Sequence, residues 1–440
     1  MATNRMTCPR AAPSFAASFV ALFAASFATL MLSAAAANAE INPYFVGVTQ
    51  SFSHYSNLLG LAEGQPTPDG TSRADTASST ALVAGIDQPF GRQRFAATVS
   101  LRDSRYNENS RLNNNGYTAS AGLDWSTAER IGGSVSASTN RSLSNLNSYQ
   151  LSILNDRNYE TTQSLNATVS MGVVTQYSLE FGVNYRQVRN SLQQEVVLTR
   201  DFDQEAVSLG LRWRPVGGTT FGVGVRGAQG RYPKFRFISD AEGYQADRFK
   251  QPSIDFSATL QPSGASALDA RLSYATTRYD LNSERNFSGV TGTLGWTWQA
   301  SGKVRVGTRL TRDTGQDSYA TTAVIFPSLP AVPSTSEYSR VNNTLRVQAD
   351  YEASAKIGIN AAVQVVQRSV VQTVKFLNVS QPSEGKDTTT TLSLGARWAP
   401  LRSVAVGCDI SNDGRTHSGE LTSDLKANSF SCYGQFQLQQ

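Results

Sequence analysis

The stretch Leu209–Thr220, LGLRWRPVGGTT, decides the fold, because an alternating apolar and polar run ends on a tryptophan and a short turn follows at once. The stretches AGLDWSTAERIGG, LGWTWQASGKV and LGARWAPLRSV have the same form. In each, the tryptophan has the parity of a preceding leucine, so both side chains point to one face of a strand. Aromatic rings beside short turns predict the periplasmic girdle of a membrane-spanning β-barrel. All five tryptophans lie at such places, namely Trp125, Trp213, Trp296, Trp298 and Trp398.

The overall composition hides this class of protein. The mean hydropathy of -0.30 and the lack of a second long apolar segment exclude a helical membrane protein. Low hydropathy does not exclude a membrane-spanning β-barrel, because only every second strand residue must be apolar. The formal net charge of +5 is small for 440 residues, so we expect no nucleic-acid partner.

The first residues of the chain indicate export. Arg5 and Arg10 precede an apolar segment over 14–36, and the small-residue sequence Ala37-Asn38-Ala39 follows. We therefore expect residues 1–39 to be a signal peptide cleaved near Ala39, and residues 40–440 to form the barrel. An uncleaved anchor is the alternative, because the apolar segment is long for a signal. Export of a barrel predicts the outer membrane of a Gram-negative bacterium.

Short turns recur at eight places between alternating runs of roughly ten residues each. With one more strand before them, over 43–57, and one after them, over 427–438, the count is about eighteen. The sequence thus predicts an all-β fold, a transmembrane antiparallel up-and-down β-barrel with short periplasmic turns and long extracellular loops. The expected loops span 58–75, 144–158, 231–246, 314–337 and 371–386.

Alternation alone also fits a soluble β-sandwich or β-solenoid. Neither needs short turns at one end, long loops at the other and tryptophans beside the short turns, so we favour the membrane barrel. The few residues from Glu40 to Asn42 are too short for a plug domain, which disfavours an energy-coupled transporter. The proline-rich segment from Phe326 to Glu337 is the best candidate for a loop that constricts the pore.

Two cysteines follow the signal, and both have the apolar parity of the last two strands. Pairing residues whose numbers sum to 840 places Cys408 opposite Cys432. A cross-strand disulfide is one interpretation, since disulfides persist outside the cytosol. Two free thiols among membrane-facing side chains are the other.

An arginine follows each short turn after a further stretch of strand, near the opposite end of the barrel. The apolar parity places six of these residues outward, and Arg368 and Arg415 inward. Guanidinium groups match phosphate oxygens, so one hypothesis is that the outward set binds lipopolysaccharide in the outer leaflet. The alternative is a merely solvated rim. The outward set is Arg105, Arg141, Arg189, Arg231, Arg278 and Arg312.

Eleven arginines and seven acids have the inward parity, which predicts a mixed lumen with a positive excess. Such a wall favours anions and anionic polymers. Tyr106 and Tyr433 share this parity and could contact sugar rings, although filling space is the plainer role. The arginines are Arg94, Arg102, Arg186, Arg212, Arg214, Arg226, Arg271, Arg305, Arg309, Arg346 and Arg397. The acids are Asp87, Asp124, Glu180, Asp255, Asp269, Asp350 and Asp409.

Catalysis finds little support in the sequence. His54 and His417 are the two histidines, and neither has a nearby serine–acid or metal-ligand spacing. A barrel lipase that uses Ser and His is the remaining enzymatic alternative. We expect no enzymatic activity, no catalytic residues, no cofactor and no metal.

One long stretch, Gly85 to Asn145, resembles a known family. Its segments DQPFGRQR, LNNNGY and LDWS are similar to those of the EpsL-type outer-membrane β-barrel porins found with bacterial exopolysaccharide operons, and LGARWAP is compatible. The resemblance implies a barrel on the export side of exopolysaccharide synthesis, without enzymatic activity. The C-terminal FQLQQ departs from the pattern, because four residues follow Phe436.

These observations predict an outer-membrane porin that passes exopolysaccharide, acidic polymers included, by passive passage through an arginine-containing lumen. Many weak contacts suit a moving chain better than one tight site. The alternatives are a general diffusion porin for small anions and a structural or glycan-binding surface barrel. Expected partners are outer-membrane lipid, lipopolysaccharide and polysaccharide or sugar cargo; periplasmic export components could join them.

Overall fold

A computed structural model describes residues 43–439 except 128–129, 145–156, 173–174, 216, 240, 282, 324–331, 377–378 and 420–422. These residues belong to one compact unit, Pro43–Gln439. The expected signal peptide, residues 1–39, and the cleavage site near Ala39 lie outside the described residues.

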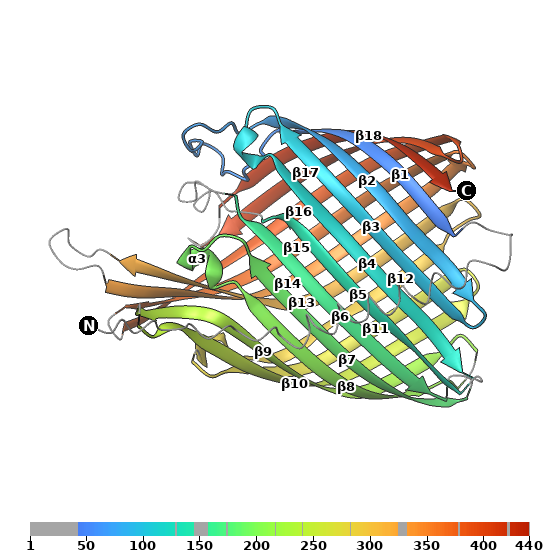
Figure 1. The fold of residues 1–440 in the computed structure, drawn as a ribbon, viewed down its shortest axis with the longest axis horizontal. Coiled ribbons are helices and arrows are strands. Elements are labelled where there is room, and N and C mark those ends of the chain that lie inside the picture. The colour runs from blue at the N-terminus through green and yellow to red at the C-terminus, as the bar shows by residue number, and fades with distance from the viewer. Residues whose placement is uncertain are drawn as a thin grey trace, which may run out of the picture. The chain divides into compact units, whose positions relative to one another are not determined.

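Antiparallel strands make up nearly all of this unit (Figure 1). The short helical segments are η1 (Ser110–Leu112), α3 (Glu195–Leu198) and η2 (Ser283–Arg285). In the described part of the chain, no helix is long and apolar enough to cross a membrane. The strands are β1 (Tyr44–Tyr55), β2 (Asp75–Phe90), β3 (Gln93–Tyr106), β4 (Asn114–Thr127), β5 (Ile131–Leu143), β6 (Tyr159–Met171), β7 (Tyr177–Asn190), β8 (Phe202–Trp213), β9 (Thr220–Ser239), β10 (Gly243–Ser263), β11 (Ser266–Tyr279), β12 (Phe287–Gln299), β13 (Val304–Ala323), β14 (Val332–Ser354), β15 (Ile357–Phe376), β16 (Val379–Leu401), β17 (Val404–Ser418) and β18 (Leu425–Gln439).

The sheet closes on itself. Each strand pairs with the next one along the chain, and β1 also pairs with β18, from Phe45↔Gln439 to Tyr55↔Ser429. The described residues therefore form a closed antiparallel barrel of eighteen strands, as the sequence predicts. Closure removes both sheet edges, which is the condition for placing a sheet in a membrane.

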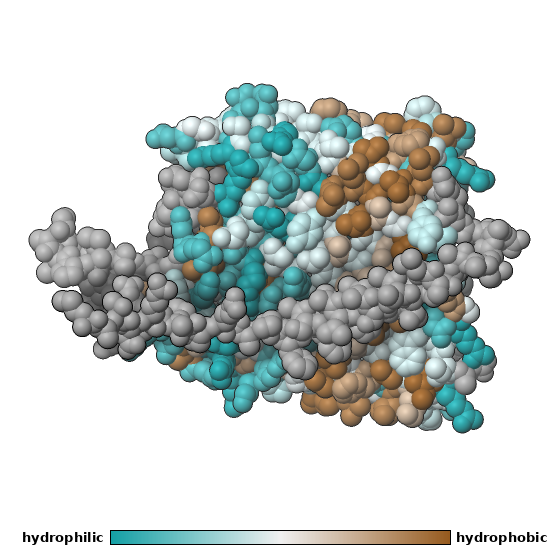
Figure 2. Space-filling view, viewed as in Figure 1, coloured by the Kyte–Doolittle hydropathy of each residue, from teal (hydrophilic) through white to brown (hydrophobic). Residues whose placement is uncertain are grey.

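Side-chain parity separates the two faces of the wall. On β8, Val207, Leu209 and Leu211 are between 46% and 51% exposed, although all three are apolar. The residues between them, such as Ser208 and Gly210, are small and point to the lumen. The space-filling view shows apolar side chains gathered on the outer surface toward the short-turn end and hydrophilic ones toward the other end (Figure 2). An apolar outer band with a polar interior defines a transmembrane β-barrel of the outer-membrane type.

The tryptophans mark the periplasmic edge of that band. Trp296 and Trp298 stack with ring centroids 5.9 Å apart, and Trp296 Nε1 donates a hydrogen bond to Ser266 Oγ at 2.9 Å. Trp213 contacts Phe221 across the β8–β9 turn, with ring centroids 5.8 Å apart. All five tryptophans occupy outward register positions beside short turns.

Three of the five expected loops are instead ends of long β-hairpins. The prediction of loops over 231–246, 314–337 and 371–386 is wrong, because β9 and β10, β13 and β14, and β15 and β16 extend through most of these segments. Their polar composition resembles that of loops. Strand residues beyond the hydrocarbon need no apolar side chains on their outward face, so the apolar alternation that identifies a strand can be lost there.

The last hairpin has the register in which paired residue numbers sum to 840. Cys408 lies opposite Cys432, and Val404 lies opposite Phe436. A disulfide joins the two cysteines on the outer face of β17 and β18. Because β18 is the strand that closes the barrel against β1, this bond fixes the register of the closing hairpin.

A charged side chain should be costly on the outer face of the wall and tolerated on the lumenal face. Substitutions at Val99 and Ser100 on β3 test this difference. Val99 is outward and 43% exposed, whereas Ser100 points to the lumen. We expect Val99→Arg to destabilise the barrel by about 2–4 kcal/mol in lipid, since its charge would enter hydrocarbon. Ser100→Arg should cost much less, because water reaches the lumen. Urea unfolding of the reconstituted barrel measures both, and equal losses would contradict the assignment of faces.

Candidate functional site: a charged lumen with a glycine-floored hollow

The register places the expected lumenal arginines on the inner face of the wall. Ten of the eleven lie within strands at inward positions. Arg214 differs, because it follows the end of β8 and donates to Thr175 O at 3.3 Å in the neighbouring turn. It therefore lies at the periplasmic rim. The ten are Arg94, Arg102, Arg186, Arg212, Arg226, Arg271, Arg305, Arg309, Arg346 and Arg397.

Several lumenal arginines are held by acids on the same face. Arg94 Nε donates to Asp87 Oδ1 at 2.7 Å. Arg212 pairs with Glu180 at 2.6 Å, and Arg271 pairs with Asp255 at 3.3 Å. These pairs are partly solvated, so each contributes little to stability. Their main effect is to fix the positions of charges along the wall.

A hollow of about 450 Å³ opens in the wall between β6 and β11. The inward positions at its centre are glycines: Gly210 lies opposite Gly224, and Gly222 lies opposite Arg212. Gly182 on β7 extends the floor toward β6. Three neighbouring strands, β7, β8 and β9, thus present backbone without side chains to the lumen.

At Gly182, Gly222 and Gly224 a side chain would crowd a neighbouring strand, although the backbone conformation does not demand glycine. A Cβ at Gly222 would meet Ser257 Oγ at 2.4 Å, and one at Gly182 would meet Ser208 Oγ at 2.6 Å. A Cβ at Gly224 would meet Leu209 O at 3.0 Å. Without side chains in the way, a flat ligand ring could lie directly against the peptide groups of the wall.

Charged side chains surround this floor. Glu180 with Arg212 lies on one side, and Asp255 with Arg271 lies on the other. Arg226 stands above Gly224 on β9, and among the described residues its guanidinium forms no ion pair or side-chain hydrogen bond. The hollow therefore holds three cations and two carboxylates, and one cation is available for an anion that enters.

The two tyrosines expected in the lumen have inward register positions, but they lie away from the hollow. Tyr106 is at the extracellular end of β3, opposite Ala77. Tyr433 lies opposite Gly407 in the last hairpin, and a Cβ on that glycine would meet its ring within 2.6 Å. The Tyr433 ring thus covers a glycine of the neighbouring strand. Neither tyrosine lines the hollow.

A buried cluster lies on the lumenal face at the extracellular end of β9–β11. Tyr232, Phe249 and Tyr279 occupy inward positions, and Tyr279 and Phe249 pack with ring centroids 5.1 Å apart. Arg285 from η2 enters this cluster, with its guanidinium carbon 4.4 Å from the Tyr279 centroid and 4.6 Å from the Tyr232 centroid. Arg285 Nη1 lies 3.7 Å from Asp247 Oδ2, and both side chains are almost fully buried.

The segment between β7 and β8 narrows the same mouth. Its helix α3 carries Val197 and Leu198, which are 0% and 3% exposed. α3 contacts β7 and β9, but it also contacts β13, which lies five strands from β8 around the wall. Since neighbouring strands are about 4.8 Å apart, the segment reaches across on the order of 24 Å of wall. It therefore covers part of the extracellular opening (Figure 1).

Sequence reasoning missed this constriction. It favoured the segment from Phe326 to Glu337, of which 326–331 lie outside the described residues. The signal was the apolar run Val196, Val197 and Leu198 inside an otherwise polar connection, since such residues favour burial.

On the outer face, the six predicted ring arginines occupy outward positions near the extracellular end. Arg105 pairs with Asp103 at 2.8 Å, and Arg189 pairs with Asp203 at 2.6 Å. The guanidinium of Arg141 lies 4.4 Å from the Tyr159 ring centroid, and Arg312 donates to Asn343 Oδ1 at 3.0 Å. The other two are Arg231 and Arg278. The remaining two, Arg368 and Arg415, point inward, and Arg368 pairs with Asp387 at 2.6 Å.

The architecture defines an outer-membrane β-barrel. No protein-family model matches the chain, and no curated protein sequence matches it. Similar solved structures include a ferric enterobactin receptor, PfeA, from Pseudomonas aeruginosa, with 8% identity, 91% of this chain and 81% of that chain covered, and a TM-score of 0.44. The siderophore receptor PirA from Acinetobacter baumannii has 6% identity, the same coverages and a TM-score of 0.44. The FrpB iron transporter from Neisseria meningitidis has 9% identity, coverages of 89% and 81%, and a TM-score of 0.45. Similarities this low say nothing about the cargo of this chain.

The constriction can be tested by removing it. Replacing residues 193–200 with a Gly-Ser-Gly linker should increase single-channel conductance in planar bilayers, because α3 covers part of the mouth. Replacing Gln193 and Gln194, which are exposed on the same segment, with serine should leave conductance close to that of the unmodified barrel. Equal conductance in the deletion variant and the unmodified barrel would show that the segment does not limit the pore.

Proposed function

We propose that this barrel is an outer-membrane porin that lets an anionic polysaccharide cross the outer membrane. The observation that carries the proposal is the hollow between β6 and β11, where Arg226 forms no ion pair or side-chain hydrogen bond among the described residues and stands beside a glycine floor. A sugar ring fits against bare backbone, and a carboxylate on that ring matches a guanidinium.

The arrangement of charges favours passage over retention. The Arg212–Glu180 and Arg271–Asp255 pairs keep two of the three cations partly neutralised, so an entering acidic sugar meets one strong contact and several weak ones. A wall of exchangeable contacts lowers the barrier for an anion without trapping it. The polymer would move down its own gradient, and the wall residues would have no catalytic role.

The constriction lies beyond the hollow on the path outward. Tyr232 is six residues from Arg226 on β9, which corresponds to about 20 Å along the strand. A polymer that enters from the periplasm would therefore meet the hollow first and the buried mouth cluster second. Displacement of α3 from the mouth would then be the step that opens the exit.

Sequence features support the same location and role. Residues 1–39 resemble an export signal with cleavage near Ala39, and Gly85 to Asn145 resembles the EpsL-type porins associated with exopolysaccharide synthesis. The proposal therefore includes the outer membrane of a Gram-negative bacterium as its location. Periplasmic components that deliver the polymer would be its partners.

A general diffusion porin for small anions is the second candidate. The buried cluster around Arg285 and the position of α3 favour it, because a narrowed mouth passes small ions more easily than a chain. Both candidates use the same basic wall. They differ in whether a polymer enters the lumen.

Arg226 provides the test of the leading proposal. Polygalacturonate oligomers should block the open-channel current, and dextran oligomers of equal length should block it much less. Arg226→Gln should weaken the block by about tenfold, since a charge-assisted contact contributes roughly 1.5 kcal/mol or more. Block is measured as the dependence of current on oligomer concentration.

Two variants serve as controls for this measurement. Arg102→Gln removes one lumenal charge outside the hollow and should lower anion preference while leaving polymer block largely intact. Gly210→Val fills the hollow, and a Cβ there meets its nearest atom at an ordinary 3.5 Å, so it should reduce block without unfolding the barrel. A conductance indifferent to both polymers would favour the small-anion porin, and a silent barrel would favour a structural role.

A further inference from the structure

Four cations gather on the outer face of β9, β10 and β11, and they face one another. Arg231 on β9 lies directly opposite Arg248 on β10, and Lys250 on β10 lies directly opposite Arg278 on β11. All four side chains are exposed. Like charges directly opposite on one sheet face are destabilising, because their Cβ atoms are only about 5 Å apart. A bound anion would relieve this repulsion.

Acids of the chain do not neutralise this group, which we name the basic patch. Asp203 lies opposite Arg231, but its carboxylate accepts two hydrogen bonds from Arg189, at 2.6 and 2.8 Å. Asp280 follows β11 beside Arg248, and its backbone amide donates to Arg248 O. Across the residues that the structure describes, none of the four cations forms an ion pair.

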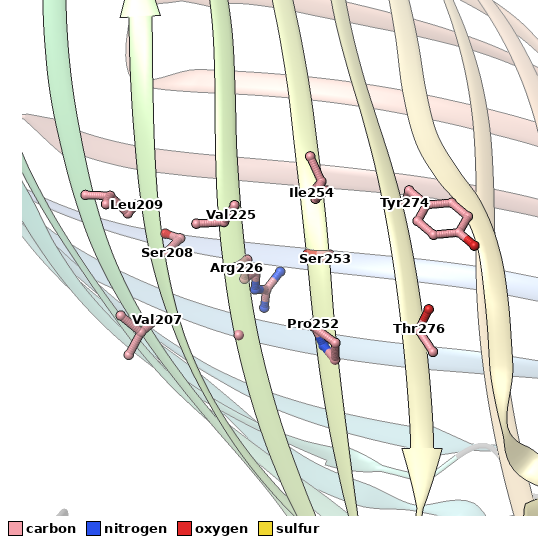
Figure 3. Close-up of a pocket in the computed structure, with 11 residues that line it drawn as sticks. Val207, Ser208, Leu209, Val225, Arg226, Pro252, Ser253, Ile254, Tyr274 and Thr276 are labelled. Atoms are coloured by element: carbon pink, nitrogen blue, oxygen red, sulfur yellow. The ribbon is translucent and has the colours of Figure 1, made fainter.

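An apolar groove of about 610 Å³ lies on the same outer face, immediately toward the membrane centre. Gly227 and Pro252 are directly opposite each other at its middle. Figure 3 shows Val225, Pro252 and Thr276 on the three adjacent strands around it. Apolar side chains complete its walls, among them Val207, Leu209, Ile254 and Tyr274.

Two residues explain why the groove exists. Gly227 has no side chain, and a Cβ built there meets nothing within 4 Å. Pro252 has no backbone N–H, and the β10–β11 pairing skips from Lys250↔Arg278 to Ser253↔Ala275. At Gly227 and Pro252 the wall therefore has a depression in its outer surface. They lie two to four residues below the basic patch, which is about 7 to 13 Å along the strand.

We propose that the basic patch and the groove together form a binding site for a phosphorylated glycolipid of the outer leaflet, the lipid A part of lipopolysaccharide. Its phosphates would lie between the opposed pairs Arg231–Arg248 and Lys250–Arg278, and one acyl chain would occupy the groove over Gly227. Guanidinium groups bind phosphate bidentately, and basic residues beside apolar membrane surface bind lipid headgroups. The site depends on the outer-membrane location of the barrel but not on its cargo.

This assignment differs from a uniform ring of lipid-binding arginines. Arg105, Arg189 and Arg312 at the same edge already have partners within the chain, and Arg141 lies over the Tyr159 ring. Within the described part of the chain, Arg231 and Arg278 are the ring members without an ion pair, side-chain hydrogen bond or ring contact, and they face Arg248 and Lys250. The lipid contacts therefore concentrate on one side of the barrel.

The test is the affinity of the purified full-length barrel in detergent for lipid A, measured by native mass spectrometry. Bisphosphorylated lipid A should bind at least about tenfold more tightly than its fully dephosphorylated form. The combined variant Arg231→Gln, Arg248→Gln and Arg278→Gln should remove most of this difference. Phosphatidylglycerol, a lipid with a single phosphate, should bind more weakly than bisphosphorylated lipid A.

A matched control removes the same charge from the same edge. The variant Arg105→Gln, Arg141→Gln and Arg312→Gln should keep lipid A affinity within about twofold. Gly227→Leu fills the groove and should weaken binding of both phosphorylated and dephosphorylated lipid A. Heat-modifiability on gels checks that every variant is folded, and unchanged channel conductance separates this site from the proposed transport function.

Three results would overturn the proposal. Equal losses in the patch variant and the control variant would show a diffuse ring rather than a site. Equal affinity for phosphorylated and dephosphorylated lipid would remove the role of the cations. A stable oligomer of the unmodified barrel that dissociates in Gly227→Leu would show that a second copy of this chain occupies the groove.

Discussion

Backbone hydrogen bonding in hydrocarbon is the constraint on which this structure depends. A strand within the membrane has no water for its N–H and C=O groups, so each must pair with a neighbouring strand. The pairing of β1 with β18 meets this requirement for the two strands that would otherwise be the free edges of the sheet. Once the ring is closed, every strand has a lipid face and a lumen face, and the character of each residue follows from its parity. The glycine floor and the basic patch are positions on these two faces.

Parity explains why the wall was largely predictable from the sequence. The number of strands, the tryptophan edge and the inward arginines all follow from a period of two, which the lipid face enforces with apolar residues. The register of the final hairpin follows from the same rule, because Cys408 and Cys432 have the apolar parity. The arginines beyond the band were placed correctly on the outer face by extending that parity.

Features that depend on contacts between distant segments were not predictable in this way. The segment with α3 reaches β13, and Arg285 enters a cluster built by three strands. Neither contact leaves a periodic signal. The long hairpins were mistaken for loops because strands beyond the hydrocarbon need no apolar alternation. The sequence shows strands with small lumenal residues. It does not show which glycines are neighbours, because that depends on the register of the six strands around the hollow.

The disulfide between Cys408 and Cys432 has a consequence for the order of assembly. Both sulfur atoms lie on the face that meets hydrocarbon, two residue pairs from Ile410 and Phe430. Thiol oxidation proceeds through a thiolate and an aqueous oxidant, and neither is favoured in lipid. We therefore expect the bond to form in water, before insertion. The last two strands then enter the membrane as one covalently joined hairpin, so that the closing strand arrives with one of its two edges already paired.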